Sequence, residues 1–165
     1  MDIELVELSQ SLGVALAAKN WRITTAESCT GGGVAAAITA IAGSSAWFEY
    51  GFVSYANAAK QKLLGVSAET LDTHGAVSEP VVIQMAQGAL TSAGADLAIA
   101  ISGIAGPSSD SSEKPVGTVW MAWARVGGEV KTALFRFHGD RLMVQHQATL
   151  QALKGAIEMC SKNTV

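Results

Sequence analysis

The chain has 165 residues, of which 49% are hydrophobic and 15% are charged, and this composition predicts one well-packed domain over residues 1–165. A net charge of −3 and few aromatic side chains argue against a nucleic-acid partner. The apolar runs are too short for a membrane span, no secretory signal is recognisable, and the two cysteines lie far apart. We therefore expect a cytoplasmic protein with no membrane partner and no bound metal.

The first predicted elements are a helix, a strand and a second helix. Leucines at helical spacing predict an amphipathic helix over residues 2–19. Residues 21–26 have the alternation and β-branched content of a short strand, and the alanine-rich run at 34–41 predicts a helix that ends near Gly43. The segment Thr24-Thr-Ala-Glu-Ser-Cys-Thr-Gly-Gly-Gly33 joins this strand to this helix.

This joining segment combines hydroxyls, a thiol, a carboxylate and three glycines. Glycines at a helix start leave backbone N–H groups open to close approach, so the turn predicts a site for an anion or a developing oxyanion. Ser28, Cys29 and Thr30 are then candidate nucleophiles. The alternative is a purely structural turn in which Thr30 is the N-cap of the helix.

A lysine stands at the start of the next predicted helix. Residues 47–55 predict a second strand, and Asn57 is expected to be the N-cap of a helix over 58–64. Lys60 then lies in the first helical turn, where the positive end of the helix dipole should lower its pKa. A neutral lysine is suited to act as a general base, whereas the alternative is a solvated lysine on the surface.

The second half of the chain adds helices, a buried strand and a hairpin. The expected elements are a helical turn over 66–74, a helix capped by Ser78 that runs to about residue 93, a strand over 96–102, a loop over 103–115, a hairpin of 117–125 and 129–137, and a final helix from Arg141 to about residue 160, capped by Asp140. The long loop follows a buried strand, where open α/β sheets bind ligands, although a plain mobile loop is the alternative. This order of elements predicts an α/β fold, a three-layer α/β/α sandwich with a mixed, mostly parallel sheet.

Several of these segments together resemble the C-terminal domain of the CinA family, the nicotinamide-nucleotide amidohydrolases, in its stand-alone form. The resemblance extends over nearly the whole chain in the right order. It is carried by Thr25-Ala-Glu-Ser-Cys-Thr-Gly-Gly32, Gly43-Ser-Ser-Ala-Trp-Phe48, Gly51-Phe-Val-Ser-Tyr-Ala-Asn57 with Lys60, Leu64-Gly-Val66, His74-Gly-Ala-Val-Ser-Glu-Pro80, Ser102-Gly-Ile-Ala-Gly-Pro107, Lys114-Pro-Val-Gly-Thr-Val119 and Gly139-Asp-Arg141.

The resemblance implies hydrolysis of the carboxamide of nicotinamide mononucleotide to nicotinic acid mononucleotide and ammonia, without a cofactor, in bacterial pyridine nucleotide recycling. It also implies a serine–lysine pair at Ser28 and Lys60, with Tyr55 beside it. In such a reaction Ser28 attacks the amide, and Lys60 takes the serine proton and passes it to ammonia. Tyr55 would relay protons or orient the lysine, and backbone N–H groups of residues 30–32 would hold the oxyanion.

The expected substrate-binding residues are spread over these same segments. Cys29 is also a competing nucleophile, because a thiolate at a helix start is activated by the same field. Glu27 either contacts a ribose hydroxyl or caps the turn, and Arg141 either binds the phosphate or forms a surface salt bridge. The full set is Glu27, Cys29, Thr30, Gly31, Gly32, Asn57, Ser102, Gly103, Gly106 and Arg141.

Three features depart from the family pattern. Residues Ser108–Ser112 stand where many members have an Asp-Gly-Gly-like turn, so this loop cannot have the same shape if those glycines used positive φ. Gln145 and His146 stand where related chains often carry arginine, which weakens binding or changes the ligand if those arginines serve the phosphate. Gly33 replaces residues that are frequently bulkier, and would widen the pocket.

These departures keep other functions open. One alternative is a non-catalytic nucleotide-binding or regulatory paralogue, and another is an amidase that acts on a different amide. The intact set of Ser28, Tyr55 and Lys60 favours the hydrolase, because titratable groups clustered at a site are costly to keep without use. The apolar surface of the alanine-rich helices also predicts a homo-oligomer.

Overall fold

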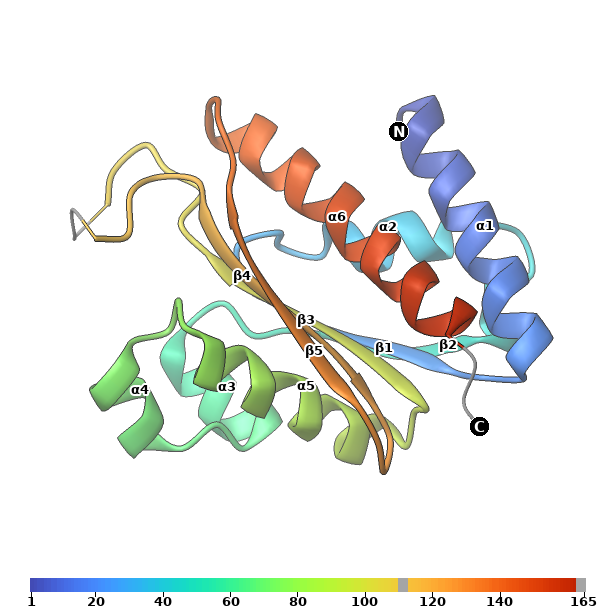
Figure 1. The fold of residues 1–165 in the computed structure, drawn as a ribbon, viewed down its shortest axis with the longest axis horizontal. Helices are drawn as coiled ribbons and strands as arrows, with labels where there is room; N and C mark the ends of the chain where they lie inside the picture. Colours follow the sequence, from blue (N-terminus) through green and yellow to red (C-terminus); the bar gives the residue numbers. More distant parts are fainter. Residues whose placement is uncertain (110–112, 163–165) are drawn as a thin grey trace.

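The structure, a computed structural model, describes residues 1–109 and 113–162 and is a sandwich of one sheet between two layers of helices (Figure 1). Helices α1, α2 and α6 cover one face of the sheet, and α3, α4 and α5 lie on the other. The helices are α1 (Ile3–Lys19), α2 (Gly33–Thr39), α3 (Asn57–Leu64), α4 (Ala68–His74), α5 (Glu79–Ala93) and α6 (Arg141–Ser161), with a 3-10 helix η1 (Ser44–Ala46). The strands are β1 (Ile23–Glu27), β2 (Phe48–Val53), β3 (Leu97–Gly103), β4 (Thr118–Arg125) and β5 (Val130–Arg136). The predicted three-layer α/β/α architecture is confirmed.

The strand order in the described sheet is β2-β1-β3-β4-β5. Strand β1 pairs in parallel with both β2 and β3, whereas β3–β4 and β4–β5 are antiparallel. The sheet is therefore mixed and mostly parallel in strand direction, as predicted, because β4 alone of the described strands runs opposite to the others and pairs antiparallel with both β3 and β5. Since β1 and β3 run in the same direction, the segments that follow Glu27 and Gly103 emerge at the same edge of the sheet.

The sheet has a hydrophobic core on each face, because the central strands β1 and β3 are buried on both sides. On the face of α1, α2 and α6, the core is built around large side chains such as Leu16, Ile99 and Trp123. On the face of α5, small strand residues such as Ala98 and Ala100 leave room for Met85 and its neighbours. Because the side chains on this second face are small, α5 packs close to the sheet, and α3 packs in turn against α5.

Helix α3 is held against α5 by a glycine. A Cβ placed on Gly88 of α5 would lie 1.8 Å from the carbonyl oxygen of Leu64, the last residue of α3. Only glycine permits this distance between the two backbones. The contact matters for the site described below, because α3 carries Lys60.

Several element boundaries differ from the sequence-based predictions. Helix α2 ends at Thr39, short of Gly43, which instead precedes η1 with a φ of 87°. Helix α4 begins at Ala68, where the hydroxyl of Ser67 accepts a hydrogen bond from the backbone N–H of Thr70. Ser78 does precede α5 as predicted, but its hydroxyl donates to the carbonyl of Gly75 and does not cap the helix.

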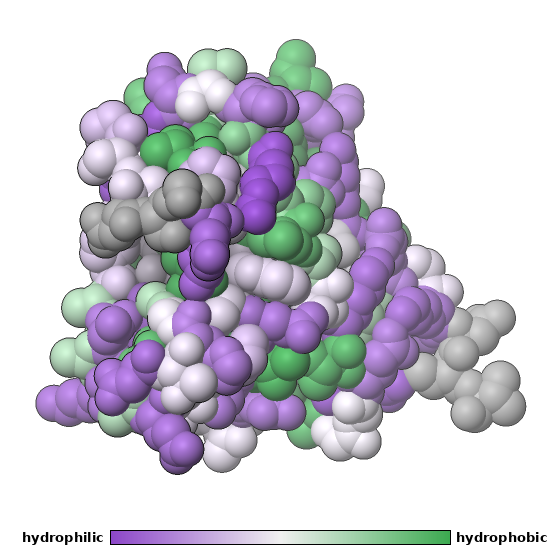
Figure 2. Space-filling view, turned by 60° about the vertical axis from the view of Figure 1, so that its left-hand side comes forward, coloured by the Kyte–Doolittle hydropathy of each residue, from purple (hydrophilic) through white to green (hydrophobic). Residues whose placement is uncertain are grey.

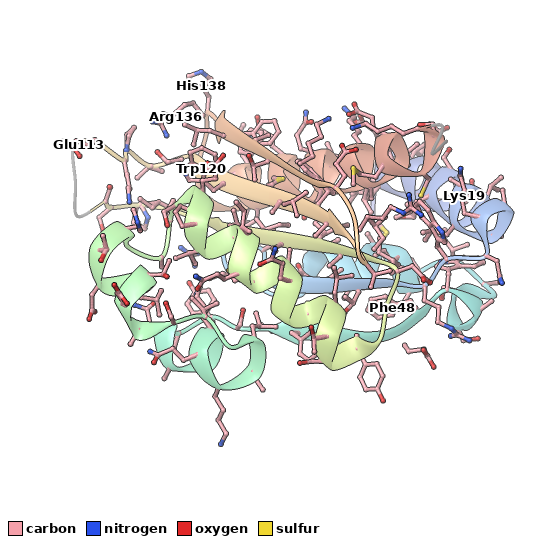
Figure 3. All side chains as sticks on the ribbon, turned by 60° about the horizontal axis from the view of Figure 1, so that its bottom comes forward. Lys19, Phe48, Glu113, Trp120, Arg136 and His138 are labelled. Atoms are coloured by element: carbon pink, nitrogen blue, oxygen red, sulfur yellow. The ribbon has the colours of Figure 1, made fainter. Side chains whose placement is uncertain are left out.

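The end of the sandwich at which β1 and β3 finish is polar and irregular. Loop 104–117, whose residues 110–112 lie outside the described part, extends from this end (Figure 1). Figure 3 shows Glu113, Arg136 and His138 at this end, opposite Lys19 and Phe48. Figure 2 shows hydrophilic and apolar residues interspersed here rather than a single continuous apolar patch.

Candidate active site

Ser28 is the first residue after β1 and is held at the edge of the sheet by the strands on either side. Its backbone N–H donates to the carbonyl of Ile101 at 3.0 Å, and the preceding carbonyl, of Glu27, accepts from the N–H of Ser54 at 2.8 Å. The Ser28 side chain has little freedom, because only 7% of the residue is exposed. The serine is thus placed by the sheet rather than by a mobile loop.

Lys60 reaches Ser28 from α3. Its Nζ atom lies 3.0 Å from Oγ of Ser28, 2.9 Å from the carbonyl oxygen of Ser54 and 3.0 Å from the carbonyl oxygen of Tyr55. The residue is 1% exposed, so the predicted alternative of a solvated surface lysine is wrong. Two backbone carbonyls and the hydroxyl of Ser28 are thus the three hydrogen-bond partners of Nζ.

The surroundings of Lys60 favour its neutral form. Burial lowers the pKa of the lysine below its ordinary value of 10.5, because an ammonium loses its hydration in the protein interior. The predicted direction of the shift is therefore confirmed, but the main cause is burial rather than the helix dipole. In the neutral amine, two N–H groups donate to the carbonyls and the lone pair faces the hydroxyl of Ser28.

The start of α3 also differs from the prediction. The N-cap is Ala56, which has no side-chain cap, and Asn57 is the first helical residue. Lys60 is therefore one residue further into the helix than expected, and its backbone N–H donates to the carbonyl of Ala56 at 3.1 Å. Asn57 is free of a capping role and lines the cavity described below.

Glu27 holds together the turn that follows Ser28. Its fully buried carboxylate accepts hydrogen bonds from Oγ1 of Thr30 at 2.6 Å, from the N–H of Val34 at 2.9 Å and from the N–H of Ala35 at 3.0 Å. Of the two roles expected for Glu27, the structure therefore shows the cap of the turn. The carboxylate oxygens face the start of α2 and not the cavity. The N-cap position of α2 belongs to Gly32, so the alternative in which Thr30 is the N-cap is wrong.

Cys29 is buried beside Ser28, but its thiol is not activated. Burial raises the pKa of the Cys29 thiol to about 12, with further contributions from its surroundings. The expected thiolate is therefore contradicted, because loss of hydration outweighs the field at the helix start. Ser28, in contrast, lies within hydrogen-bond distance of Lys60.

Tyr55 and Arg141 both line the cavity described next, and their side chains contact each other. The Nη2 group of Arg141 donates to the hydroxyl of Tyr55 at 2.7 Å, and Nη1 donates to the carbonyl of Gly106 at 2.5 Å. Arg141 therefore contacts two other walls of the site, and within the described residues it does not form the predicted alternative, a surface salt bridge. Tyr55 meets Lys60 through its backbone carbonyl, while its hydroxyl faces Arg141.

These residues surround a cavity of about 270 Å³. Nine of the predicted site residues line it: Ser28, Cys29, Tyr55, Asn57, Lys60, Ser102, Gly103, Gly106 and Arg141. The other predicted residues, Glu27, Thr30, Gly31 and Gly32, are not among the lining residues and form the turn behind Ser28. Five further residues complete the walls and were not among the predicted site residues: Ala76, Val77, Ile104 and Ala105, which belong to the recognised motifs, and Ser108, which begins the departing segment.

The three departures from the family pattern have different places in the structure. Gly33 lies against α6, where an added Cβ would be 3.2 Å from Oγ1 of Thr149, so its expected role in widening the pocket is not found. Nε2 of His146 lies 3.0 Å from a carboxylate oxygen of Asp2, the N-cap residue of α1. Gln145 contacts the turn after Ser28, and Ser108 lines the cavity while residues 110–112 lie outside the described part.

The described residues contain no group of three or more His, Cys, Asp or Glu side chains placed to hold a metal ion. A search of the same residues for a helix with the length and apolar character of a membrane span finds none.

Comparisons with known proteins agree with the fold and the motifs. The sequence is 58% identical over 163 residues to nicotinamide-nucleotide amidohydrolase PncC of Escherichia coli strain K12, covering 99% of both chains. The fold matches a CinA superfamily protein from Klebsiella pneumoniae with a TM-score of 0.92 and 46% identity, covering 95% of this chain and 98% of that one. It also matches a competence/damage inducible protein from Agrobacterium tumefaciens with a TM-score of 0.93 and 41% identity, covering 96% and 99%. The family description that matches residues 5–160 is the CinA C-terminal domain. The chain belongs to the CinA C-terminal domain family.

Proposed function

We propose that this protein is a nicotinamide-nucleotide amidohydrolase that converts nicotinamide mononucleotide and water to nicotinic acid mononucleotide and ammonia, with Ser28 as nucleophile and Lys60 as base. The observation that carries the proposal is the 3.0 Å contact between Nζ of Lys60 and Oγ of Ser28 in a buried site. The 58% identity to an amidohydrolase of that name supports the choice of substrate.

In the first half of the reaction, Oγ of Ser28 attacks the carboxamide carbon while its proton moves to Nζ of Lys60. The carbonyl oxygen becomes an oxyanion, and the backbone N–H groups after Ser28 are placed to stabilise it. The C–N bond then breaks as the Lys60 ammonium returns its proton to the departing nitrogen. This step releases ammonia, leaves an ester on Ser28 and restores the neutral amine of Lys60.

In the second half, a water molecule attacks the ester carbon and gives a proton to Lys60. When the bond to Oγ of Ser28 breaks, Lys60 passes this proton to the serine, and the product leaves as the carboxylic acid, which ionises. The carbonyls of Ser54 and Tyr55 hold Nζ in one place, so the lysine need not move between the two halves.

Arg141 is the residue that we assign to the phosphate of the substrate. It lines the cavity and is exposed, while two of its donors are already fixed by Tyr55 and Gly106. A guanidinium held in one orientation loses little conformational entropy when its remaining N–H groups bind an anion. The phosphate would then lie at the open side of the cavity and the carboxamide at Ser28.

The experiment that tests the function measures ammonia and nicotinic acid mononucleotide released by the purified protein from nicotinamide mononucleotide. We expect equal amounts of the two products from the wild type, and none from Ser28→Ala or Lys60→Ala with the fold retained in circular dichroism. Binding of the nucleotide without turnover would favour a non-catalytic paralogue. Neither binding nor turnover would point to a different amide.

A further inference from the structure

One face of α6 is directed at the turn that carries Ser28. Arg141, Gln145 and Thr149 follow one another at intervals of four residues and therefore share a face of the helix. The side-chain nitrogen of Gln145, Nε2, donates to the carbonyl oxygen of Cys29 at 2.9 Å. This contact joins two segments 116 residues apart and reaches the peptide unit directly after the nucleophile.

The backbone of this turn is anchored at almost every other point. The N–H of Ser28 binds β3, the N–H of Gly31 donates to the carbonyl of Ser28 at 3.0 Å, and Thr30 is held by the carboxylate of Glu27. The N–H of Cys29 is directed at its own thiol, so among the described residues of the turn the N–H groups of Thr30 and Gly32 are the ones without an acceptor. They are the donors left for an oxyanion formed at Ser28.

We propose that Gln145 is a positioning residue for oxyanion stabilisation, and that it acts by holding the peptide unit between Cys29 and Thr30 in one orientation. The inference rests on the proposed amidohydrolase function. In a trans peptide the C=O and N–H groups point in opposite directions, so the hydrogen bond from Gln145 to the carbonyl of Cys29 also fixes the direction of the Thr30 N–H. The same hydrogen bond polarises the peptide unit and makes that N–H a stronger donor.

The contact also separates the roles of Gln145 and Arg141. Gln145 supplies an N–H donor to a backbone carbonyl oxygen, whereas Arg141 carries the cation that we assign to the phosphate. The phosphate therefore does not need a cation at this position, since Arg141 lies one turn earlier on the same face. At position 145 the structure shows a donor to the carbonyl of Cys29.

The test compares Gln145→Met and Gln145→Glu with a matched control, Gln147→Met. Methionine fills a similar volume without a donor, and an ionised glutamate has the shape of glutamine without a donor. Gln147 lies on the same helix, but its side chain donates to the carbonyls of His138 and Met143 and does not touch the catalytic turn. Ammonia release from nicotinamide mononucleotide and inhibition by nicotinic acid mononucleotide are measured for each variant.

We expect both Gln145 variants to lower kcat by about 10- to 100-fold, the range for a misplaced or weakened oxyanion donor. KM, the inhibition constant of the product and the melting temperature should change no more than in Gln147→Met, because the interaction is made in the transition state. Equal kcat values in Gln145→Met and Gln147→Met would overturn the inference. So would a loss of folding in both Gln145 variants, since that would give Gln145 a purely structural role. A wild type without turnover would instead refute the proposed function itself.

Discussion

The side-chain nitrogen of Lys60 lies 3.0 Å from the side-chain oxygen of Ser28, although the two residues are 32 positions apart and belong to different layers of the fold. Ser28 ends a central strand, and Lys60 comes from a helix that is held in place by α5. Their contact therefore depends on the packing of α3 and α5 against the sheet as well as on the two side chains.

Replacement of Lys60 should remove catalysis without removing the nucleophile. Lys60→Met keeps the aliphatic chain but has no base, and Lys60→Arg keeps the charge but cannot deprotonate near neutral pH. We expect both variants to lower kcat by about 10²–10⁴-fold, the usual contribution of a general base. The measurement is ammonia release, and the exposed Lys62→Met on the same helix serves as the control. Near wild-type activity in Lys60→Arg would exclude the role of a neutral lysine.

The rate should rise with pH as Lys60 loses its proton. Burial lowers the pKa of Lys60 below 10.5, so the neutral amine is populated at lower pH in the folded protein than in the unfolded chain. We expect kcat/KM to fall about tenfold per pH unit below this lowered pKa and to level off above it. The folded state binds fewer protons at Lys60 than the unfolded chain between the two pKa values, so this group's contribution to stability falls as pH falls through that window.

The pH profile of kcat/KM, taken with thermal melts at each pH, measures this directly. A rising limb centred at or above 10.5 would contradict the shift, because it would mean that Lys60 titrates as an exposed lysine.

Cys29 should be dispensable for turnover. Its thiol is 4% exposed and its pKa is raised to about 12, so almost none of it is thiolate near neutral pH. Cys29→Ala keeps the backbone carbonyl that binds Gln145, and we expect its kcat to stay within about threefold of the wild type. Iodoacetamide should not inactivate the native wild type. Rapid inactivation by iodoacetamide that is absent in Cys29→Ala would restore the thiol as a candidate nucleophile.

Glu27→Gln should destabilise the protein although it changes a single atom. The carboxylate accepts hydrogen bonds from Thr30, Val34 and Ala35, and an amide nitrogen would face at least one of these donors. We expect the free energy of unfolding to fall by about 1–3 kcal/mol, the cost of an unsatisfied buried polar group. Urea unfolding measures the change. Glu69→Gln, at an exposed site in α4, is the control, and an equal effect of the two substitutions would contradict the capping role.

Gly88→Ala should disturb the active site from the far side of α3. The added Cβ would lie 1.8 Å from the carbonyl oxygen of Leu64, so α3 and Lys60 must move. We expect a loss of about 1–3 kcal/mol in stability and a fall in kcat of up to about 100-fold. The hairpin residue Gly128, whose added Cβ would meet nothing closer than 3.8 Å, provides the control Gly128→Ala. Full activity in Gly88→Ala would show that the placement of Lys60 does not depend on this contact.

The fold was largely predictable because most elements carry local signals. The leucine spacing of α1, the apolar run of β3, and the capping residue Asp140 of α6 were each read correctly from the sequence. The position of the hairpin in the sheet was not predictable, because the sequence of a hairpin does not reveal which strand its first member will join.

The candidate site was predictable as a set of motifs but not as a set of contacts. The motifs located nine of the residues that line the cavity, yet the pairing of Arg141 with Tyr55 joins positions 86 apart and has no local signal. The burial of Cys29 depends on β3 and the loop after it, so its raised pKa also follows from tertiary structure alone. The expected homo-oligomer and cytoplasmic location stay predictions.

The most direct test of the account looks for the ester on Ser28. The wild type, Cys29→Ala and Ser28→Ala are each mixed with nicotinamide mononucleotide, quenched in acid during turnover, and examined by intact-mass and peptide mass spectrometry, with hydroxylamine added in parallel to intercept the acyl group as a hydroxamate. The account predicts an acyl adduct or hydroxamate from the wild type and Cys29→Ala, and neither from Ser28→Ala. An adduct or hydroxamate that persists in Ser28→Ala, or that is lost in Cys29→Ala, would contradict it.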